Sequence, residues 1–283
     1  MKKLFMLSLA AVLHLPLFAA KQVDRNPPPL KVLAIGNSFS EDAVEQYLFE
    51  LAAAAGREII IGNLYIGGAP IHFHVDNIKE NKHPYSYRKI ESMYVKTVTQ
   101  NVTLAQGIAD EDWDYISVQQ VSPDSGRYDV IMKHLPQLLA YIREQAPNAK
   151  IVYHQTWAYQ HDSTHGGFAN YDRSQEKMYN AIIETTRKIS ELKDIHFIIP
   201  CGTAVQNART SSLGDTLTKD GYHLEMTYGR FIAACTWYEK LLGLDVRKNP
   251  YKPDSITELQ SSIAKEAAYK AVKTPFKVSK IKK

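Results

Sequence analysis

Short apolar runs alternate with amphipathic segments along most of this chain, and this alternation limits the folds open to it. The runs expected to form strands lie at 31–36, 58–66, 115–120, 150–157 and 195–200. The segments with helical spacing of apolar residues lie at 43–56, 130–145, 174–192 and 229–243. Strands that alternate with helices form right-handed βαβ units. The pattern therefore predicts an α/β fold, in which helices cover both faces of a mainly parallel sheet.

Two segments interrupt the alternation. Residues 83–104 are rich in Tyr, Val and Thr, which favours a β-hairpin inserted into the fold. Residues 159–172 are polar and aromatic and contain two glycines, as is typical of a long loop beside a functional site.

The first twenty residues have the pattern of a secretory signal peptide. Lys2 and Lys3 precede the apolar stretch 4–18, and small residues follow up to Ala20. The stretch is too short to span a bilayer, so no stable membrane insertion is expected. We therefore expect an exported protein that is periplasmic or extracellular after cleavage near Ala20.

The remaining chain divides by composition. Residues 21–29 include three consecutive prolines and form an extended lead-in, 30–272 form one α/β domain, and 273–283 form a basic tail that we expect to be flexible. Five of the lysines lie in that tail, although the whole chain has a formal net charge of only +4. The domain itself has no basic excess, so a nucleic-acid partner is not expected.

The sequence contains two cysteines, Cys201 and Cys235. One ends an apolar strand and the other lies in an apolar helix, so two buried free thiols are expected rather than a bridge. Two cysteines are also too few for a structural zinc site.

Ligands of open α/β sheets bind beyond the carboxyl ends of the strands. The chain places polar groups and glycines at these positions, beginning with the stretch LAIGNSFSEDA after the first strand. The residues expected there are Gly36, Asn37, Ser38, Gly67, Gly68, Ala69, Gln119, Gln120, His154, Gln155 and Trp157.

Ser38 becomes a candidate nucleophile because the segment KDGYHLE supplies two possible partners. A serine hydroxyl reacts only when a histidine takes its proton and a carboxylate orients that histidine. Asp220 and His223 are close enough in sequence for one loop to bring them together. Without such partners, Ser38 would be read as a helix cap.

Attack on an ester creates an oxyanion that requires preorganised donors. The Ser38 N–H, a glycine N–H and a side-chain amide could supply three. Gly67 and Gly68 lie about thirty residues after Ser38, roughly one βαβ unit further on.

These blocks, in this order, resemble the SGNH (GDSL-like) hydrolase superfamily over roughly residues 31–245. The resemblance implies a flavodoxin-like three-layer αβα sandwich and a serine esterase without a cofactor. It also implies that Ser38 is the nucleophile, His223 the base, Asp220 its orienter, and Gly68, or else Gly67, an oxyanion donor. The third block departs from the family pattern, because VQQVSPD replaces the usual Gly-x-Asn-Asp. Gln120, or else Gln119, is the expected substitute for the asparagine.

Two further interpretations concern other side chains. His72, His74 and Asp76 alternate as metal ligands on a strand would, but no further ligand set is evident, so no metal is expected. His154, Trp157 and Tyr159, together with Asn37 and Gln119, are expected to contact substrate, with ordinary packing as the competing interpretation.

We therefore expect a secreted serine esterase that removes small acyl groups, acetyl above all, from a small-molecule or glycan ester. The alternative is a glycan-binding protein that retains the fold without the activity. The sequence specifies neither the acyl group, the sugar nor the oligomeric state.

Overall fold

The computed structural model describes residues 27–93 and 95–283. The expected signal peptide and most of the lead-in lie outside these residues. The strands in the described part are β1 (Leu30–Gly36), β2 (Ile59–Tyr65), β3 (Tyr85–Ser92), β4 (Val95–Val102), β5 (Tyr115–Val118), β6 (Lys150–His154) and β7 (Ile198–Ile199). The helices are α1 (Ser38–Val44), α2 (Leu48–Ala54), α3 (Ile71–Lys79), α4 (Leu104–Ala109), α5 (Tyr128–Met132), α6 (Leu135–Gln145), α7 (Gln175–Ser190), α8 (Cys201–Arg209), α9 (Tyr228–Leu242) and α10 (Glu258–Lys273).

The strands form one sheet in the order β4-β3-β2-β1-β5-β6-β7. Strands β2, β1, β5, β6 and β7 run parallel to one another. Strands β3 and β4 form an antiparallel hairpin that extends the sheet beyond β2, which confirms the hairpin predicted over 83–104.

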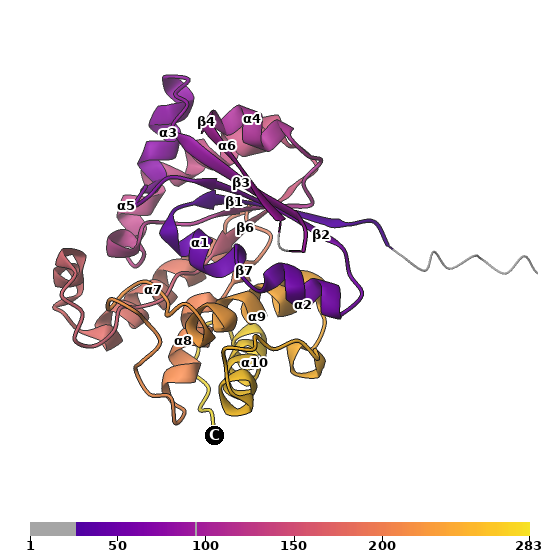
Figure 1. Ribbon diagram of the computed structural model, residues 1–283. Helices are drawn as coiled ribbons and strands as arrows, with labels where there is room; N and C mark the ends of the chain where they lie inside the picture. The colour runs from indigo at the N-terminus through magenta and orange to yellow at the C-terminus, as the bar shows by residue number, and fades with distance from the viewer. Residues whose placement is uncertain (1–26, 94) are drawn as a thin grey trace, which may run out of the picture.

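Helices cover both faces of this sheet, and the predicted three-layer αβα arrangement is confirmed. Figure 1 shows α8, α9 and α10 on one side of the sheet and α3, α4 and α6 on the other. Alternate residues of β1 serve the two cores: Val32 and Ala34 pack in the first, Leu33 and Ile35 in the second. A strand buried on both faces has a continuous apolar sequence, and this is why 32–35 is apolar throughout.

The chain changes direction across the sheet at β1. It passes from β1 to β2 on one side and later enters β5 on the other side of β1. Such a reversal leaves a crevice at the carboxyl end of the strand, where ligands bind in folds of this class. The residues that follow β1 begin with Asn37 and Ser38.

Two predicted helices are each divided into two. The segment 43–56 belongs to α1 and α2, which are separated at Tyr47, a residue with a φ of 70°. The Tyr47 hydroxyl donates to the Met226 carbonyl at 3.1 Å, so the residue at this break is hydrogen-bonded to the segment before α9. The segment 130–145 is divided near His134, because Pro136 in the first turn of α6 cannot continue a preceding helix.

The C-terminal segment is docked, and the expectation of a flexible tail is corrected here. Ile281 is buried, and its N–H donates to Thr210 Oγ1 at 2.9 Å. The Ser279 N–H donates to Asn207 Oδ1 at 2.6 Å. The buried isoleucine anchors the segment, while the neighbouring Lys280 and Lys282 remain exposed to water.

Cys201 and Cys235 are both buried and are not bonded to each other, as expected. Within 27–93 and 95–283, no helix combines the length and apolar character that crossing a membrane requires.

Candidate active site

Ser38 is the first residue of α1, directly beyond the carboxyl end of β1. Asn37 caps this helix: its Oδ1 accepts the Phe39 N–H at 3.0 Å, and its carbonyl accepts the Ser40 and Glu41 N–H groups. The Ser38 N–H, by its position, has no acceptor within the helix. The chain passes directly from β1 into α1 at Asn37, and this places both the hydroxyl and the amide of Ser38 at the edge of the sheet.

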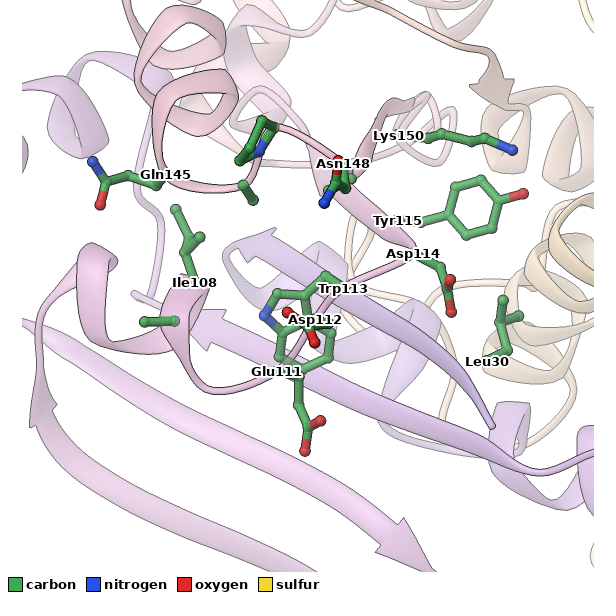
Figure 2. A pocket seen from close by; sticks show the side chains of 14 residues that line it. Leu30, Ile108, Glu111, Asp112, Trp113, Asp114, Tyr115, Gln145, Asn148 and Lys150 are labelled. Atoms are coloured by element: carbon green, nitrogen blue, oxygen red, sulfur yellow. The ribbon is translucent and has the colours of Figure 1, made fainter. Parts of the chain in front are cut away.

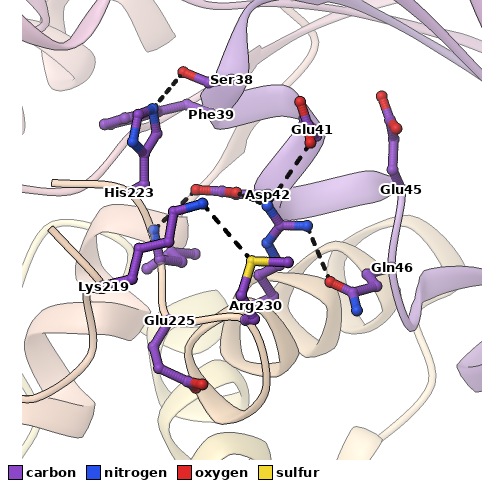
Figure 3. Close-up of polar contacts among 12 residues, drawn as sticks. Ser38, Phe39, Glu41, Asp42, Glu45, Gln46, Lys219, His223, Glu225 and Arg230 are labelled. Carbon is purple, nitrogen blue, oxygen red and sulfur yellow. Dashed lines mark hydrogen bonds and ion pairs between the residues drawn. The ribbon is translucent and has the colours of Figure 1, made fainter.

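Ser38, His223 and Asp220 form a continuous hydrogen-bonded chain. Ser38 Oγ lies 2.9 Å from His223 Nε2, and His223 Nδ1 lies 2.6 Å from Asp220 Oδ2 (Figure 3 shows the first contact). An ionised carboxylate can only accept, so Nδ1 carries the proton and Nε2 is free to accept from the serine hydroxyl. The sequence-predicted triad is thus brought together in one place.

Asp220 is held in its ionised form by its own loop. Partial burial acts to raise its pKa, but hydrogen bonds from the His223 side chain and from the His223 and Tyr222 N–H groups outweigh this and leave the pKa below its ordinary value. Oδ1 accepts those two N–H groups at 2.8 and 3.2 Å. The loop turns at Gly221, whose φ of +90° and close approach to Ser163 leave no room for a side chain.

A cavity of about 540 Å³ opens above the triad. Its walls come from the segments after β1, β2 and β5, from the 159–172 loop, and from the segment before α9. The lining residues are Asn37, Ser38, Phe39, Glu41, Asp42, Tyr65, Gly67, Gly68, Val121, Ser122, Pro123, His165, Lys219, Tyr222, His223 and Arg230.

A second hollow, of about 440 Å³, lies at the opposite edge of the sheet. Figure 2 shows it at the amino ends of the strands, where Leu30, Tyr115 and Lys150 begin β1, β5 and β6. Its walls, among the described residues, carry the carboxylates of Glu111, Asp112 and Asp114 but no serine or histidine. The side chains suited to nucleophilic chemistry therefore lie in the first cavity.

Both glycines of the second block line the cavity. They lie in a turn after β2 that is closed by a hydrogen bond of 3.2 Å from the Ala69 N–H to the Ile66 carbonyl. Gly68 has a φ of +64°, a conformation that favours glycine, whereas Gly67 has no positive φ. The turn is anchored to the nucleophile segment, because Asn37 Nδ2 donates to the Ala69 carbonyl at 3.0 Å.

The two glutamines lie beneath the cavity and not among its lining residues. Gln120 Oε1 accepts the Ile71 and Val121 N–H groups at 3.0 and 2.9 Å, which joins the segments after β2 and β5. Gln119 Nε2 donates to Asn37 Oδ1 at 2.8 Å. Both side chains are almost fully buried and support the segments around the cavity. The contact with Asn37 uses the Gln119 amide nitrogen, whereas the two Gln120 contacts use its oxygen, so an oxyanion role for Gln120 stays a prediction.

Three residues expected to contact substrate are also buried. His154, Trp157 and Tyr159 have no exposed surface. Trp157 stacks on Phe39 with ring centroids 4.3 Å apart, which supports the wall next to Ser38 from behind. These side chains are large and apolar enough to complete the core, and packing is the role that the structure gives them.

His154 ends a buried chain of amide contacts. Gln119 Oε1 lies 2.9 Å from His154 Nδ1, and because Gln119 Nε2 donates to Asn37, Nδ1 must carry the proton. Burial lowers the pKa of His154 to about 3, so the ring stays neutral. The chain from His154 through Gln119 fixes the orientation of the Asn37 cap, and so the start of α1.

The histidines considered as metal ligands are separated from the triad. His72 and His74 lie in helix α3 and not on a strand, and His74 Nδ1 is 2.9 Å from the Tyr85 hydroxyl in the core. Burial lowers the pKa of His74 to about 4. Among the residues that the structure describes, no group of three or more His, Cys, Asp or Glu side chains could hold a metal ion.

Several cavity residues were not predicted as contacts from the sequence. Those with chemically useful side chains are Glu41, Asp42, Tyr65, His165, Lys219, Tyr222 and Arg230. Most of them flank a predicted motif, and His165 belongs to the loop that was expected to lie near a site. Their positions in sequence give no direct sign that they face one cavity.

The chain matches a family model over residues 31–271, described as a domain of unknown function, DUF4886. It is similar to the crystal structure of a DUF4886 family protein from Bacteroides uniformis ATCC 8492, with 50% identity and a TM-score of 0.88, over 89% of this chain and 98% of that one. A comparison with curated proteins found no match.

Solved structures matched at lower identity include SGNH hydrolases and esterases. A candidate SGNH hydrolase from Slackia heliotrinireducens shares 19% identity with a TM-score of 0.49, over 75% of this chain and 98% of that one. An acetyl xylan esterase, AlAXEase, shares 17% identity with a TM-score of 0.46, over 74% and 98%. From the family model and the half-identical crystal structure, the chain belongs to the DUF4886 family.

Proposed function

We propose that this chain is an exported serine esterase of SGNH type that hydrolyses small acyl esters, acetyl esters above all, on a carbohydrate. The observation that carries the proposal is the continuous contact from Ser38 Oγ through His223 to Asp220 at the floor of an open cavity. A packing role would not require a hydroxyl, an imidazole and a carboxylate in this order.

In the proposed reaction, Ser38 Oγ attacks the acyl carbon while His223 Nε2 takes the hydroxyl proton. The tetrahedral intermediate collapses when the bond to the alcohol oxygen breaks, and His223 returns the proton to that oxygen. A water then attacks the acyl-enzyme with the same base, and Ser38 recovers its proton as the acid leaves. Asp220 stabilises the imidazolium in both halves of the cycle.

Two backbone groups are suited to bind the oxyanion. The Ser38 N–H lies at the start of α1, where the helix leaves its first amides without internal acceptors. The Gly68 N–H belongs to the turn after β2, which lines the same cavity as Ser38, with Gly67 as the alternative donor. For the third position we propose the Gln120 amide, because its Oε1 accepts two backbone N–H groups and its Nε2 is left as a donor.

The walls of the cavity favour a small acyl group on a polar alcohol. Within the described chain, the only lining side chains without a polar group, glycines aside, are Phe39, Val121 and Pro123, which leaves little aliphatic surface to bind a long acyl chain. Tyr65, Tyr222 and His165 offer aromatic faces and hydrogen-bonding tips, a combination that suits sugar rings.

Export is the part of the proposal that rests on sequence alone. The basic, apolar and small-residue pattern of residues 1–20 supports it. Expression of the whole gene with its leader, followed by mass determination of the periplasmic or extracellular product, tests it: export predicts a chain shortened near Ala20, and a full-length cellular chain contradicts export.

The catalytic proposal is tested with Ser38→Ala and the matched control Ser40→Ala. Ser40 lies on the same helix, but its hydroxyl contacts the Asn37 carbonyl at 2.7 Å and does not line the cavity. With p-nitrophenyl acetate and acetylated xylo-oligosaccharides as substrates, we expect turnover to vanish in Ser38→Ala and to persist in Ser40→Ala, with or without a chelator. Wild-type turnover retained by Ser38→Ala would refute the scheme, and sugar binding without turnover by the wild type would favour the glycan-binding alternative.

A further inference from the structure

Asp42 connects helix α1, which carries Ser38, to the segment that carries Asp220 and His223. It lies one helical turn after Ser38 on α1 and is 1% exposed. Its Oδ2 accepts the Leu224 N–H at 2.9 Å, and its Oδ1 lies 2.6 Å from a guanidinium nitrogen of Arg230 on α9 (Figure 3). One buried carboxylate thus contacts the segment that carries the base and the helix that follows it.

The hydrogen bond to Leu224 acts next to the base. Leu224 directly follows His223, so the position of its amide is coupled to the position of the imidazole by one peptide unit. Residues four apart on a helix share a face. Ser38 and Asp42 therefore lie on the same face of α1, and Asp42 accepts the amide of the residue that follows His223.

Arg230 holds this buried carboxylate in place, with a guanidinium nitrogen 2.6 Å from Asp42 Oδ1. Burial raises the pKa of Asp42 above its ordinary value, and the Arg230 guanidinium and the Leu224 N–H offset that effect only in part. Arg230 is itself buried and also donates to Gln46 Oε1 at 3.0 Å, beyond the end of α1. The pair therefore fixes α1 against α9 on either side of the His223 segment.

We propose that Asp42 is a positioning residue, which holds the His223 segment against α1 so that His223 Nε2 stays within hydrogen-bond distance of Ser38 Oγ. The inference rests on the proposed esterase function. It assigns no proton transfer to Asp42. Its effect is exerted through the Leu224 amide and the peptide unit that joins Leu224 to His223.

Two double variants isolate this hydrogen bond. Asp42→Asn with Arg230→Met keeps a carbonyl acceptor for the Leu224 N–H, and Asp42→Leu with Arg230→Met has a side chain of similar shape without an acceptor. Replacing Arg230 in both prevents a buried unpaired cation, whose presence would destabilise the fold by itself. If the leucine variant does not fold, Asp42→Ala with Arg230→Met takes its place.

Activity is measured as kcat and KM for p-nitrophenyl acetate per active site, counted by titration with a serine-directed phosphonate. We expect kcat of the leucine variant to be about tenfold or more below that of the asparagine variant, because a small misplacement of the base costs a large factor in rate. KM should be similar in the two, and the rate of inactivation by the phosphonate should fall in parallel with kcat.

A second buried carboxylate provides the control. Glu239 is also buried on α9 and accepts a loop amide, that of Val246, at 2.6 Å, outside the cavity. Glu239→Gln and Glu239→Met should differ in thermal stability but have equal kcat. If Asp42 had only a structural role, its two double variants would likewise differ in thermal stability and have equal kcat.

The outcomes separate this inference from the proposed function. Equal kcat and equal inactivation rates in the two Asp42 variants, with an active wild type, would overturn the positioning role and leave the esterase proposal standing. A wild type that neither turns over the ester nor reacts with the phosphonate would overturn both.

Discussion

Ser38 Oγ and His223 Nε2 lie 2.9 Å apart although 185 positions separate the two residues in the chain. The first strand and the segment before α9 meet at this point, where the topology leaves a crevice. The chain contains a second Asp–His contact, between Asp215 and His161 at 2.8 Å, but no serine hydroxyl lies against that imidazole among the described residues. The geometry therefore distinguishes one pair from the other.

The first prediction uses this second pair as a control. His223→Ala should lower kcat for p-nitrophenyl acetate by about 10³-fold or more, because Ser38 loses its base. His161→Ala, at an exposed imidazole in a contact of similar length, should leave kcat within twofold. Steady-state kinetics of both variants test this. A similar loss of kcat in the two would show that the contact of His223 with Ser38 is not what supports catalysis.

The second prediction concerns the turn after β2. Gly68 and Gly214 have φ values of +64° and +58°, and an added Cβ at either would meet no atom within 4 Å. Gly68→Ala and Gly214→Ala should therefore each lower the free energy of unfolding by about 1–2 kcal/mol through backbone strain alone. Only Gly68→Ala should also lower kcat, because it disturbs the proposed oxyanion donor. Equal kcat in both variants would remove Gly68 from the oxyanion site.

The third prediction concerns pH and stability. The pKa of His154 is lowered by burial to about 3, while an unfolded chain would have its ordinary value near 6.5. Between these values the unfolded state binds a proton that the folded state does not, so the free energy of unfolding falls as pH decreases, by about 1 kcal/mol per pH unit for one such group.

His154→Gln should remove that contribution while it keeps an N–H donor for Gln119 Oε1. Urea denaturation at several pH values between 6.5 and 4 measures the slope. His74, whose pKa is also lowered by burial, should continue to contribute its own slope in the variant. An unchanged slope in His154→Gln would mean that His154 does not titrate in this way.

The fourth prediction concerns the docked C-terminal segment. Ile281→Ala should lower the free energy of unfolding by about 1–3 kcal/mol, because Ile281 is 3% exposed and anchors the last residues. Lys282→Ala, at an exposed neighbour, should change it by less than about 0.5 kcal/mol. Chemical denaturation of the two variants tests this, and equal stabilities would indicate a frayed terminus after all.

The fold could be predicted because its signals are local. The centre of the first strand, 32–35, is apolar throughout since both faces are covered, and the hairpin at 83–104 is marked by its Tyr, Val and Thr content. Strand order places Ser38 at the carboxyl edge of the sheet, whereas Asp220 and His223 could be predicted as its partners from their spacing of three residues and from the order of the motif blocks. Helix α10 was not among the predictions, although Thr257 and Gln260 form a capping box at its start.

The parts that were not predictable depend on tertiary contacts. Gln119, Gln120 and Trp157 follow strands and have side chains suited to binding, yet all three are buried or almost fully buried in the folded chain. Asp42 shows the reverse case, because nothing in the stretch SFSEDA indicates that its carboxylate accepts an amide 182 positions away. Which face of a short helix meets which loop is decided by packing and not by local pattern.

The central claim is that Ser38 is the nucleophile. The mature protein is incubated with a serine-directed phosphonate, turnover of p-nitrophenyl acetate is followed, and the modified protein is digested and analysed by mass spectrometry. The account predicts that turnover is lost as a single adduct forms on Ser38, and that Ser38→Ala forms no adduct. Turnover that persists without an adduct, or that is lost through an adduct on another residue, would contradict it.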